Sequence, residues 1–155
     1  MPVLFGVAPS DLSPNFGDPR SGGRTHEGED IMAVKGTPVV SPTDAVVTGT
    51  GKSGSPGIYV NTANPGGESF RYYHLDKIAP GIKAGVVLKP GDLIGFVGNT
   101  GNAAGGPTHL HFEVRKGRKA LDPYSRLNGA FTAQQTIRSL QAIIKILQQQ
   151  LADER

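Results

Sequence analysis

The sequence predicts a mainly β protein, an antiparallel sandwich or barrel, followed by one C-terminal amphipathic helix. Short runs of β-branched or aromatic residues recur along residues 31–125, and turn residues separate them. Glycine and proline, at 22 and 12 of the 155 residues, supply many turns, and none lies after residue 129. Hydrophobic residues make up 37% of the chain, which together with the glycines is ordinary for one globular domain.

Residues 1–15 are expected to form an N-terminal loop segment, because turn residues punctuate them. The opening residues carry no basic stretch and are too short for a signal peptide. We therefore expect a signal that has been removed, a piece of a larger secreted protein, or delivery by a phage or virion. No apolar run approaches about 18 residues, so no membrane span is predicted.

Seven runs are the predicted strands of a domain that spans residues 16–127. They are residues 39–40, 45–48, 58–61, 70–75, 86–88, 93–97 and 108–114. Lys89-Pro90-Gly91-Asp92 has the composition of a type II turn and is expected to join two strands as a hairpin. No helical pattern alternates with the runs, which argues against a parallel α/β sheet.

One glycine-rich stretch resembles a phosphate-binding loop. Residues 49–54, Gly-Thr-Gly-Lys-Ser-Gly, match G-x-G-x-x-G and the end of a Walker A motif. Both motifs need a following helix to hold the phosphate, but Ser55-Pro56-Gly57 comes next. A β-turn is the better interpretation.

Residues 132–153 change to a helical pattern. Apolar residues step by three and four, at Ile137, Leu140, Ile144, Leu147 and Leu151, and Ile143 and Ile146 widen the stripe. The helix is expected to pack on the β domain, or to be the stub of a longer chain that self-associates or binds a partner. The pattern covers only about two to three heptads, which is short for a coiled coil.

Composition removes several classes of protein. The chain has no cysteine, which excludes disulfides, thiolate zinc sites, iron–sulfur clusters and a cysteine nucleophile. The net charge is +3, but the basic residues are scattered and do not cluster with aromatic residues. No nucleic-acid partner is therefore expected.

Two of the four histidines share one face of a predicted strand. Side chains alternate along a strand, so His109, His111 and Glu113 face one way. The opposite face carries Leu110, Phe112 and Val114. Two imidazoles that converge on one side are more typical of a metal site than of a core. His74 ends another predicted strand, on the same side as Tyr72.

A third histidine and a carboxylate complete a candidate metal site. His26 precedes Asp30 by four residues, and Gly28 between them favours a loop. Zinc prefers imidazole and carboxylate where thiolates are lacking, and catalytic zinc has three protein ligands and an open position. The residues thus predict a Zn²⁺ site.

These residues also resemble those of the M23 peptidases, the lysostaphin-type or LytM-type zinc endopeptidases of the bacterial cell wall. The resemblance runs from about Phe16 to Leu127. The motifs, in family order, are His26-x-Gly28-x-Asp30-Ile31, Gly36-Thr37-Pro38-Val39, Tyr73-His74-Leu75, Lys89-Pro90-Gly91-Asp92-Leu93-Ile94-Gly95 and Pro107-Thr108-His109-Leu110-His111-Phe112-Glu113.

The resemblance implies a β-sheet fold with a groove, and zinc held by His26, Asp30 and His111. It implies that His109 is the general base and that His74 stabilises the tetrahedral intermediate. The implied reaction is hydrolysis of a peptide bond in peptidoglycan stem peptides or cross-bridges, by a secreted, periplasmic or cell-wall-associated enzyme.

Two further residues are expected to contact the substrate, Arg20 and Tyr72. The glycyl-glycine-cutting branch of the family tends to carry tyrosine shortly before its first metal histidine, where this chain has Arg20. That resembles the wider branch, which cuts D-alanyl or diaminopimelate-type cross-links. Arg20 either meets a substrate carboxylate or forms a surface salt bridge.

Two alternatives belong to other functional classes. A non-catalytic domain that binds cell wall or activates an amidase would usually lack metal ligands, and here all five positions are filled. Residues 86–95 also resemble biotinyl or lipoyl carrier domains, but the chain has no segment with a lysine at a hairpin tip flanked by methionine or similar residues.

Overall fold

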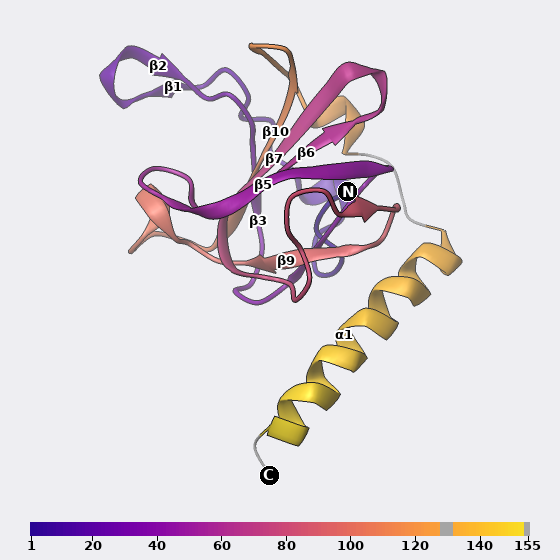
Figure 1. Cartoon of the computed structure of the whole chain (residues 1–155). Helices are drawn as coiled ribbons and strands as arrows, with labels where there is room; N and C mark the ends of the chain where they lie inside the picture. Colours follow the sequence, from indigo (N-terminus) through magenta and orange to yellow (C-terminus); the bar gives the residue numbers. More distant parts are fainter. Residues whose placement is uncertain (128–131, 154–155) are drawn as a thin grey trace.

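Antiparallel pairing joins the strands of one large sheet in the computed structural model, which describes residues 1–127 and 132–153 (Figure 1). The strands of this sheet are β3 (Glu29–Met32), β4 (Pro38–Val40), β5 (Ala45–Ser53), β6 (Gly57–Asn64), β7 (Glu68–Ile78), β8 (Val87–Leu88), β9 (Leu93–Val97), β10 (His109–Lys116) and β11 (Lys119–Leu121). A separate small hairpin pairs β1 (Pro19–Arg20) with β2 (Arg24–Thr25) and projects from the body (Figure 1). The helix α1 is Ala133–Asp153.

The sheet order places β10 at the centre of the functional region. The main path is β11-β10-β7-β6-β5-β8, while β3 pairs with β10, and β9 pairs with both β4 and β7. β10 therefore has β3, β7 and β11 as neighbours. Residues that lie far apart in the sequence meet on these strands.

Each of the seven predicted runs overlaps a strand, and the predicted mainly β, antiparallel class is confirmed. The structure adds β3, which begins with two acidic residues and so lacks the apolar signal of a strand. It adds β1, β2 and β11, of two or three residues each. The glycine-rich residues 49–53 lie within β5 rather than in the predicted β-turn, and the turn into β6 follows them at residues 54–56.

The turn at residues 89–92 forms, but the predicted hairpin does not. The amide of Asp92 donates to the carbonyl of Lys89 at 2.9 Å, and Gly91 has φ of 89°, as a type II turn requires. β8 before the turn pairs with β5, whereas β9 after it pairs with β4 and β7. The hairpin prediction was wrong because both strands find other partners.

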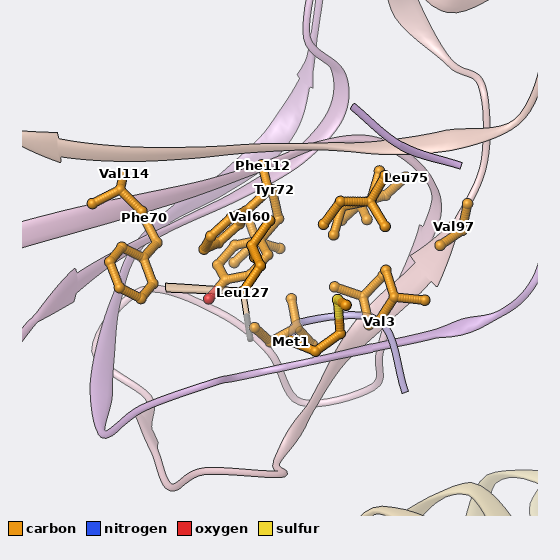
Figure 2. Packing of buried hydrophobic residues seen from close by; sticks show 14 of the residues in the cluster. Met1, Val3, Val60, Phe70, Tyr72, Leu75, Val97, Phe112, Val114 and Leu127 are labelled. Carbon is orange, nitrogen blue, oxygen red and sulfur yellow. The ribbon is translucent and has the colours of Figure 1, made fainter. Parts of the chain in front are cut away.

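The core lies under one face of β7 and β10. Leu110, Phe112 and Val114 of β10 are buried as alternation predicts, and Phe112 stacks edge-on against Phe70 of β7 with ring centroids 5.3 Å apart (Figure 2). The N-terminal segment lacks strands but reaches the same core, where Val3 is 2% exposed (Figure 2). Because the apolar side chains of β10 face the core, His109, His111 and Glu113 face the opposite side of the strand.

The helix α1 lies along the outside of the β domain, on the side of β9 (Figure 1). Its residues Ile143 and Ile146 pack on a small buried cluster that includes Leu93 and Phe96. No helix among residues 1–127 and 132–153 is long and apolar enough to cross a membrane.

Replacing Phe112 with alanine should lower the free energy of unfolding by about 3–5 kcal/mol, because it removes a buried ring without collapse of its surroundings. Urea denaturation followed by circular dichroism measures this loss. Val87→Ala is the control, since Val87 is 64% exposed and its loss should cost about 0.5 kcal/mol or less. Equal losses in the two variants would contradict the assignment of the core.

Candidate metal centre

Three candidate ligands meet where β3 pairs with β10. Asp30 of β3 lies directly opposite His111 of β10 in the antiparallel register. His26 comes from the loop between β2 and β3, and its amide donates to the carbonyl of Asp18 at 2.8 Å. We call His26, Asp30 and His111 the triad.

The ligand atoms of the triad converge on one point. His26 Nε2 lies 3.0 Å from Asp30 Oδ1 and 3.0 Å from His111 Nδ1. His111 Nδ1 lies 2.8 Å from the same carboxylate oxygen. Each residue offers one ligand atom, and these atoms all lie within 4.8 Å of one another. Both histidines are buried, and Asp30 is half-buried.

Hydrogen bonds outside the triad fix the tautomers of its two imidazoles. His26 Nδ1 lies 2.8 Å from the carbonyl of Asn15, which can only accept, so Nδ1 carries the proton. His111 Nε2 lies 3.2 Å from Glu113 Oε1 and donates to it in the same way. When both rings are neutral, the two nitrogens that face each other therefore both present lone pairs. A metal cation would satisfy both nitrogens and the carboxylate oxygen.

Glu113 is held ready to accept from His111 by two arginines. Its Oε2 lies 3.0 Å from Arg115 Nη1 and 3.4 Å from Arg71 Nη1. Burial alone would raise the pKa of Glu113, but the hydrogen bonds to His111 and Arg115 outweigh it and lower that pKa. Glu27 lies 3.0 Å from Arg115 on its other side.

Gly28 allows the loop of His26 to approach β10. A Cβ atom at this position would lie 2.6 Å from the carbonyl oxygen of Phe112 and 2.9 Å from His111 Nε2. Any side chain would displace the backbone or the imidazole. The glycine between His26 and Asp30 is thus required by close packing.

Asp30 is the charged member of the triad. Burial alone would raise its pKa, but hydrogen bonds with His111 and His26 overcome that and hold the pKa well below its usual range. Its second oxygen, Oδ2, forms an ion pair with Arg20 at 2.7 Å. Of the two uses expected for Arg20, the structure shows the salt bridge, and the substrate contact stays a prediction.

A bulge in β7 turns His74 toward the triad. Opposite β6 the register shifts, so that Tyr73 and His74 face one residue of the partner strand. His74 has φ of 63°, the left-handed region that is uncommon for residues other than glycine. Its Nδ1 lies 2.8 Å from the carbonyl of Thr100, which accepts a hydrogen bond from it. In the neutral ring Nε2 therefore carries no proton.

The bulge corrects the prediction that Tyr72 and His74 share one side of the strand. Tyr72 keeps the regular alternation and is fully buried in the core (Figure 2). Its neighbour Tyr73 instead stacks on His111, with ring centroids 5.7 Å apart. Tyr72 therefore does not reach the site as a substrate contact, because its ring fills the core.

The fourth imidazole, His109, completes the group. Its Nδ1 lies 3.0 Å from the carbonyl of Pro107, and its Nε2 lies 3.8 Å from Asp30 Oδ1. The ring centroids of His74 and His109 are 5.0 Å apart. Burial lowers the pKa of His74 to about 4, against the hydrogen bond to the Thr100 carbonyl, so this ring is neutral near pH 7.

All four imidazoles line one open hollow of about 400 Å³. Three arginines, Arg20, Arg24 and Arg71, also line it. Its wall includes Asn102 and Ala103, from the glycine-rich loop that follows β9. The hollow thus combines four imidazoles and three arginines with the carboxylates of Asp30, Glu27 and Glu113.

Several residues of the site escaped the sequence analysis. Asn15 and Thr100 act through backbone carbonyls, which no side-chain pattern can reveal. Glu113 was placed on the correct face by alternation, and its spacing of two from His111 was the available signal. Tyr73 stands in the motif Tyr73-His74-Leu75, but the side that it faces could not be predicted, since the bulge that re-aims it depends on pairing with β6.

Comparisons with known proteins identify the family of the chain. Peptidase family M23 matches residues 24–123. The chain is 38% identical over 126 residues to the L-Ala--D-Glu endopeptidase of Bacillus subtilis, which covers 72% of this chain and 38% of that protein. It is 36% identical over 102 residues to the DD-carboxypeptidase/endopeptidase Mpg of Neisseria meningitidis, covering 66% of this chain and 23% of that protein.

The catalytic domain of lysostaphin from Staphylococcus simulans has a similar structure. It superposes with a TM-score of 0.67 at 26% sequence identity, over 78% of this chain and 96% of that domain. The chain spans only the minor part of the Bacillus and Neisseria relatives, so the likeness concerns one domain of each. By the extent of the sequence match and this shared fold, the chain belongs to peptidase family M23.

Proposed function

We propose that the protein is a zinc-dependent endopeptidase that hydrolyses a peptide bond in the peptide part of bacterial peptidoglycan. The observation that carries this proposal is the convergence of two unprotonated ring nitrogens and a carboxylate oxygen on an open hollow with two further imidazoles. The printed names of the relatives support the substrate class: an L-Ala--D-Glu endopeptidase, a DD-carboxypeptidase/endopeptidase, and the peptidoglycan DD-endopeptidase ShyA of Vibrio cholerae. Such a substrate requires a secreted, periplasmic or cell-wall-associated location.

The triad is a ligand set that fits zinc. Two imidazoles and one carboxylate are ligands that zinc accepts, and three protein ligands leave a position open for chemistry. Bound zinc would supply a Lewis acid and lower the pKa of a water ligand to about 7. His26 would bind through Nε2, Asp30 through Oδ1 and His111 through Nδ1.

His109 is the proposed general base. The carbonyl of Pro107 accepts a hydrogen bond from Nδ1, so the neutral form of the ring presents an unprotonated Nε2 toward the triad. That nitrogen can accept a proton from the attacking water and return it to the leaving amine. His74 also presents an unprotonated Nε2. It can therefore stabilise an oxyanion only after it has taken up a proton during the reaction.

The rim of the hollow suits an anionic peptide. Arg71 is 36% exposed at the side chain, and Arg24 is exposed on the projecting hairpin β1–β2. Stem peptides of peptidoglycan carry free carboxylates, which arginine binds in bidentate fashion. We propose that these side chains and Arg20 orient such carboxylates beside the imidazoles.

Substitution of His26 and of His109 should separate metal binding from catalysis. His26→Ala should lose both zinc and activity, because it removes a ligand. His109→Ala should keep about one zinc per chain and lose about 10²–10⁴-fold in turnover, the usual contribution of a general base. Zinc is measured by atomic emission, and activity by mass spectrometry of peptides released from purified peptidoglycan.

The wild type and a surface variant, Lys116→Gln, serve as controls, because Lys116 is exposed at the end of β10 away from the triad. An inactive wild type with one bound zinc would favour a non-catalytic domain. A wild type that binds no zinc would overturn the proposed site altogether.

Glu113 is a positioning residue in this proposal, since it orients His111 without touching substrate. Glu113→Gln should weaken zinc binding about 10–100-fold, the usual effect of removing the partner that orients a metal-binding histidine. Competition with a chelating dye measures the dissociation constant without reference to activity.

Glu27→Gln is the matched control, because Glu27 binds the same Arg115 but does not touch His111. It should leave the zinc affinity within about twofold, as expected for an exposed ion pair. Equal effects of both substitutions would show that Glu113 acts only through the arginine network.

A further inference from the structure

Two different loops hold His74 in place. Its amide donates to the carbonyl of Pro56 at 2.9 Å, in the turn between β5 and β6. Its ring Nδ1 lies 2.8 Å from the carbonyl of Thr100, in the loop between β9 and β10. The left-handed φ of 63° at His74 costs free energy for a residue with a side chain, so the surrounding contacts must maintain it. The orientation of the imidazole therefore depends on how the two loops are fixed.

The hydroxyl of Thr100 connects its loop to two strands. Its Oγ1 donates to the carbonyl of Leu75, the residue after His74 in β7, at 2.7 Å. The same oxygen accepts from the amide of Ile58, the second residue of β6, at 2.9 Å. Thr100 thus contacts the ring of His74 through its carbonyl, and contacts β6 and β7 through its hydroxyl.

Close packing keeps the two loops together. The amide of Asn102 donates to the carbonyl of Ser55 at 3.1 Å. A Cβ atom at Gly57 would collide with the main chain and the hydroxyl of Thr100. A Cβ atom at Gly101 would collide with the main chain of Ser55 and Gly57. The main chains of the two loops therefore touch directly, and the hydroxyl of Thr100 lies within this packed contact.

The side chain of Thr100 transmits this anchoring to its own carbonyl. Threonine is β-branched, which restricts rotation about χ1, so the position of Oγ1 limits where the backbone of the residue can lie. With Oγ1 held by one donated and one accepted hydrogen bond, the carbonyl of Thr100 is directed at His74 Nδ1. The lining of the hollow includes His74 but not Thr100, so Thr100 acts on the site through the imidazole.

We propose that Thr100 is the positioning residue of His74. Its hydroxyl fixes the carbonyl that keeps the proton of the neutral imidazole on Nδ1, and this leaves Nε2 unprotonated on the side of the hollow. The inference rests on the proposed function, which assigns to His74 the stabilisation of the oxyanion. Loss of the hydroxyl should therefore disturb the step that His74 assists, while the triad keeps its metal.

Thr100→Val tests the proposal, because valine keeps the branched shape and lacks the hydroxyl. The amide of Ile58 and the carbonyl of Leu75 lose their partner, and the carbonyl of Thr100 is no longer held against His74. Turnover of a soluble cross-linked peptidoglycan fragment should fall about 10–100-fold, the usual cost of a misplaced catalytic group. KM should not change, because the lost interaction belongs to the transition state. Zinc content should match the wild type.

The tautomer of His74 gives a second readout that does not depend on activity. Long-range ¹H–¹⁵N NMR of the zinc-loaded wild type should show the proton of His74 on Nδ1. In Thr100→Val, part of the population should carry it on Nε2, whereas the tautomers of His26 and His111 should not change. If the wild type proves inactive, the proposed function fails, and the tautomer of His74 still decides whether Thr100 positions the imidazole.

Thr100→Ser keeps the hydroxyl and should retain both the wild-type turnover and the wild-type tautomer. Thr37→Val is the matched control, since the hydroxyl of Thr37 donates to the carbonyl of Val34 at the same 2.7 Å and lies outside the hollow. It should change neither readout.

A wild-type tautomer of His74 in Thr100→Val would overturn the proposal. Equal losses in Thr37→Val would overturn it as well, because they would show a general loss of stability. If Thr100→Val does not fold, Thr100→Ala repeats the test, because it removes the hydroxyl without placing a methyl group beside the carbonyl of Leu75.

Discussion

The site depends on one constraint, that a neutral imidazole has one ring nitrogen with a proton and one without. In this protein an acceptor outside the triad receives a hydrogen bond from one ring nitrogen of each histidine. Backbone carbonyls of Asn15, Thr100 and Pro107 accept from three rings, and Glu113 accepts from His111. The remaining nitrogens all face inward as lone pairs. The same hydrogen bonds that hold the rings therefore prepare two of them to bind metal and two to exchange protons.

The β-sheet supplies the positions that this arrangement needs. Alternation along β10 buries Phe112 in the core and so directs His111 and Glu113 to the opposite face. The antiparallel register then sets Asp30 opposite His111. A buried carboxylate beside a metal ligand is costly unless it is paired, and the arginines behind Glu113 offset that cost. The packing of Phe112 and the hydrogen bond to Glu113 thus both fix the imidazole of His111.

The sequence was sufficient for the parts that follow from local periodicity. Alternation placed His109 and His111 on one face, and the three–four spacing placed α1. It failed where pairing between distant strands overrides alternation. Because of the bulge at His74, Tyr72 faces the core and Tyr73, not Tyr72, faces the site. The periodicity of α1 also could not show that Ile143 packs on the β domain while Ile144 and Leu147 stay exposed. Such choices depend on neighbours that no short window contains.

Long-range ¹H–¹⁵N correlation NMR of the histidine side chains, at about pH 8 in zinc-loaded protein, measures the tautomers directly. The structure predicts a proton on Nδ1 of His26, His74 and His109, and a proton on Nε2 of His111 alone. Zinc should shift Nε2 of His26 and Nδ1 of His111. A proton on Nδ1 of His111, or zinc on its Nε2, would contradict the central role of Glu113 and the acceptors around the site.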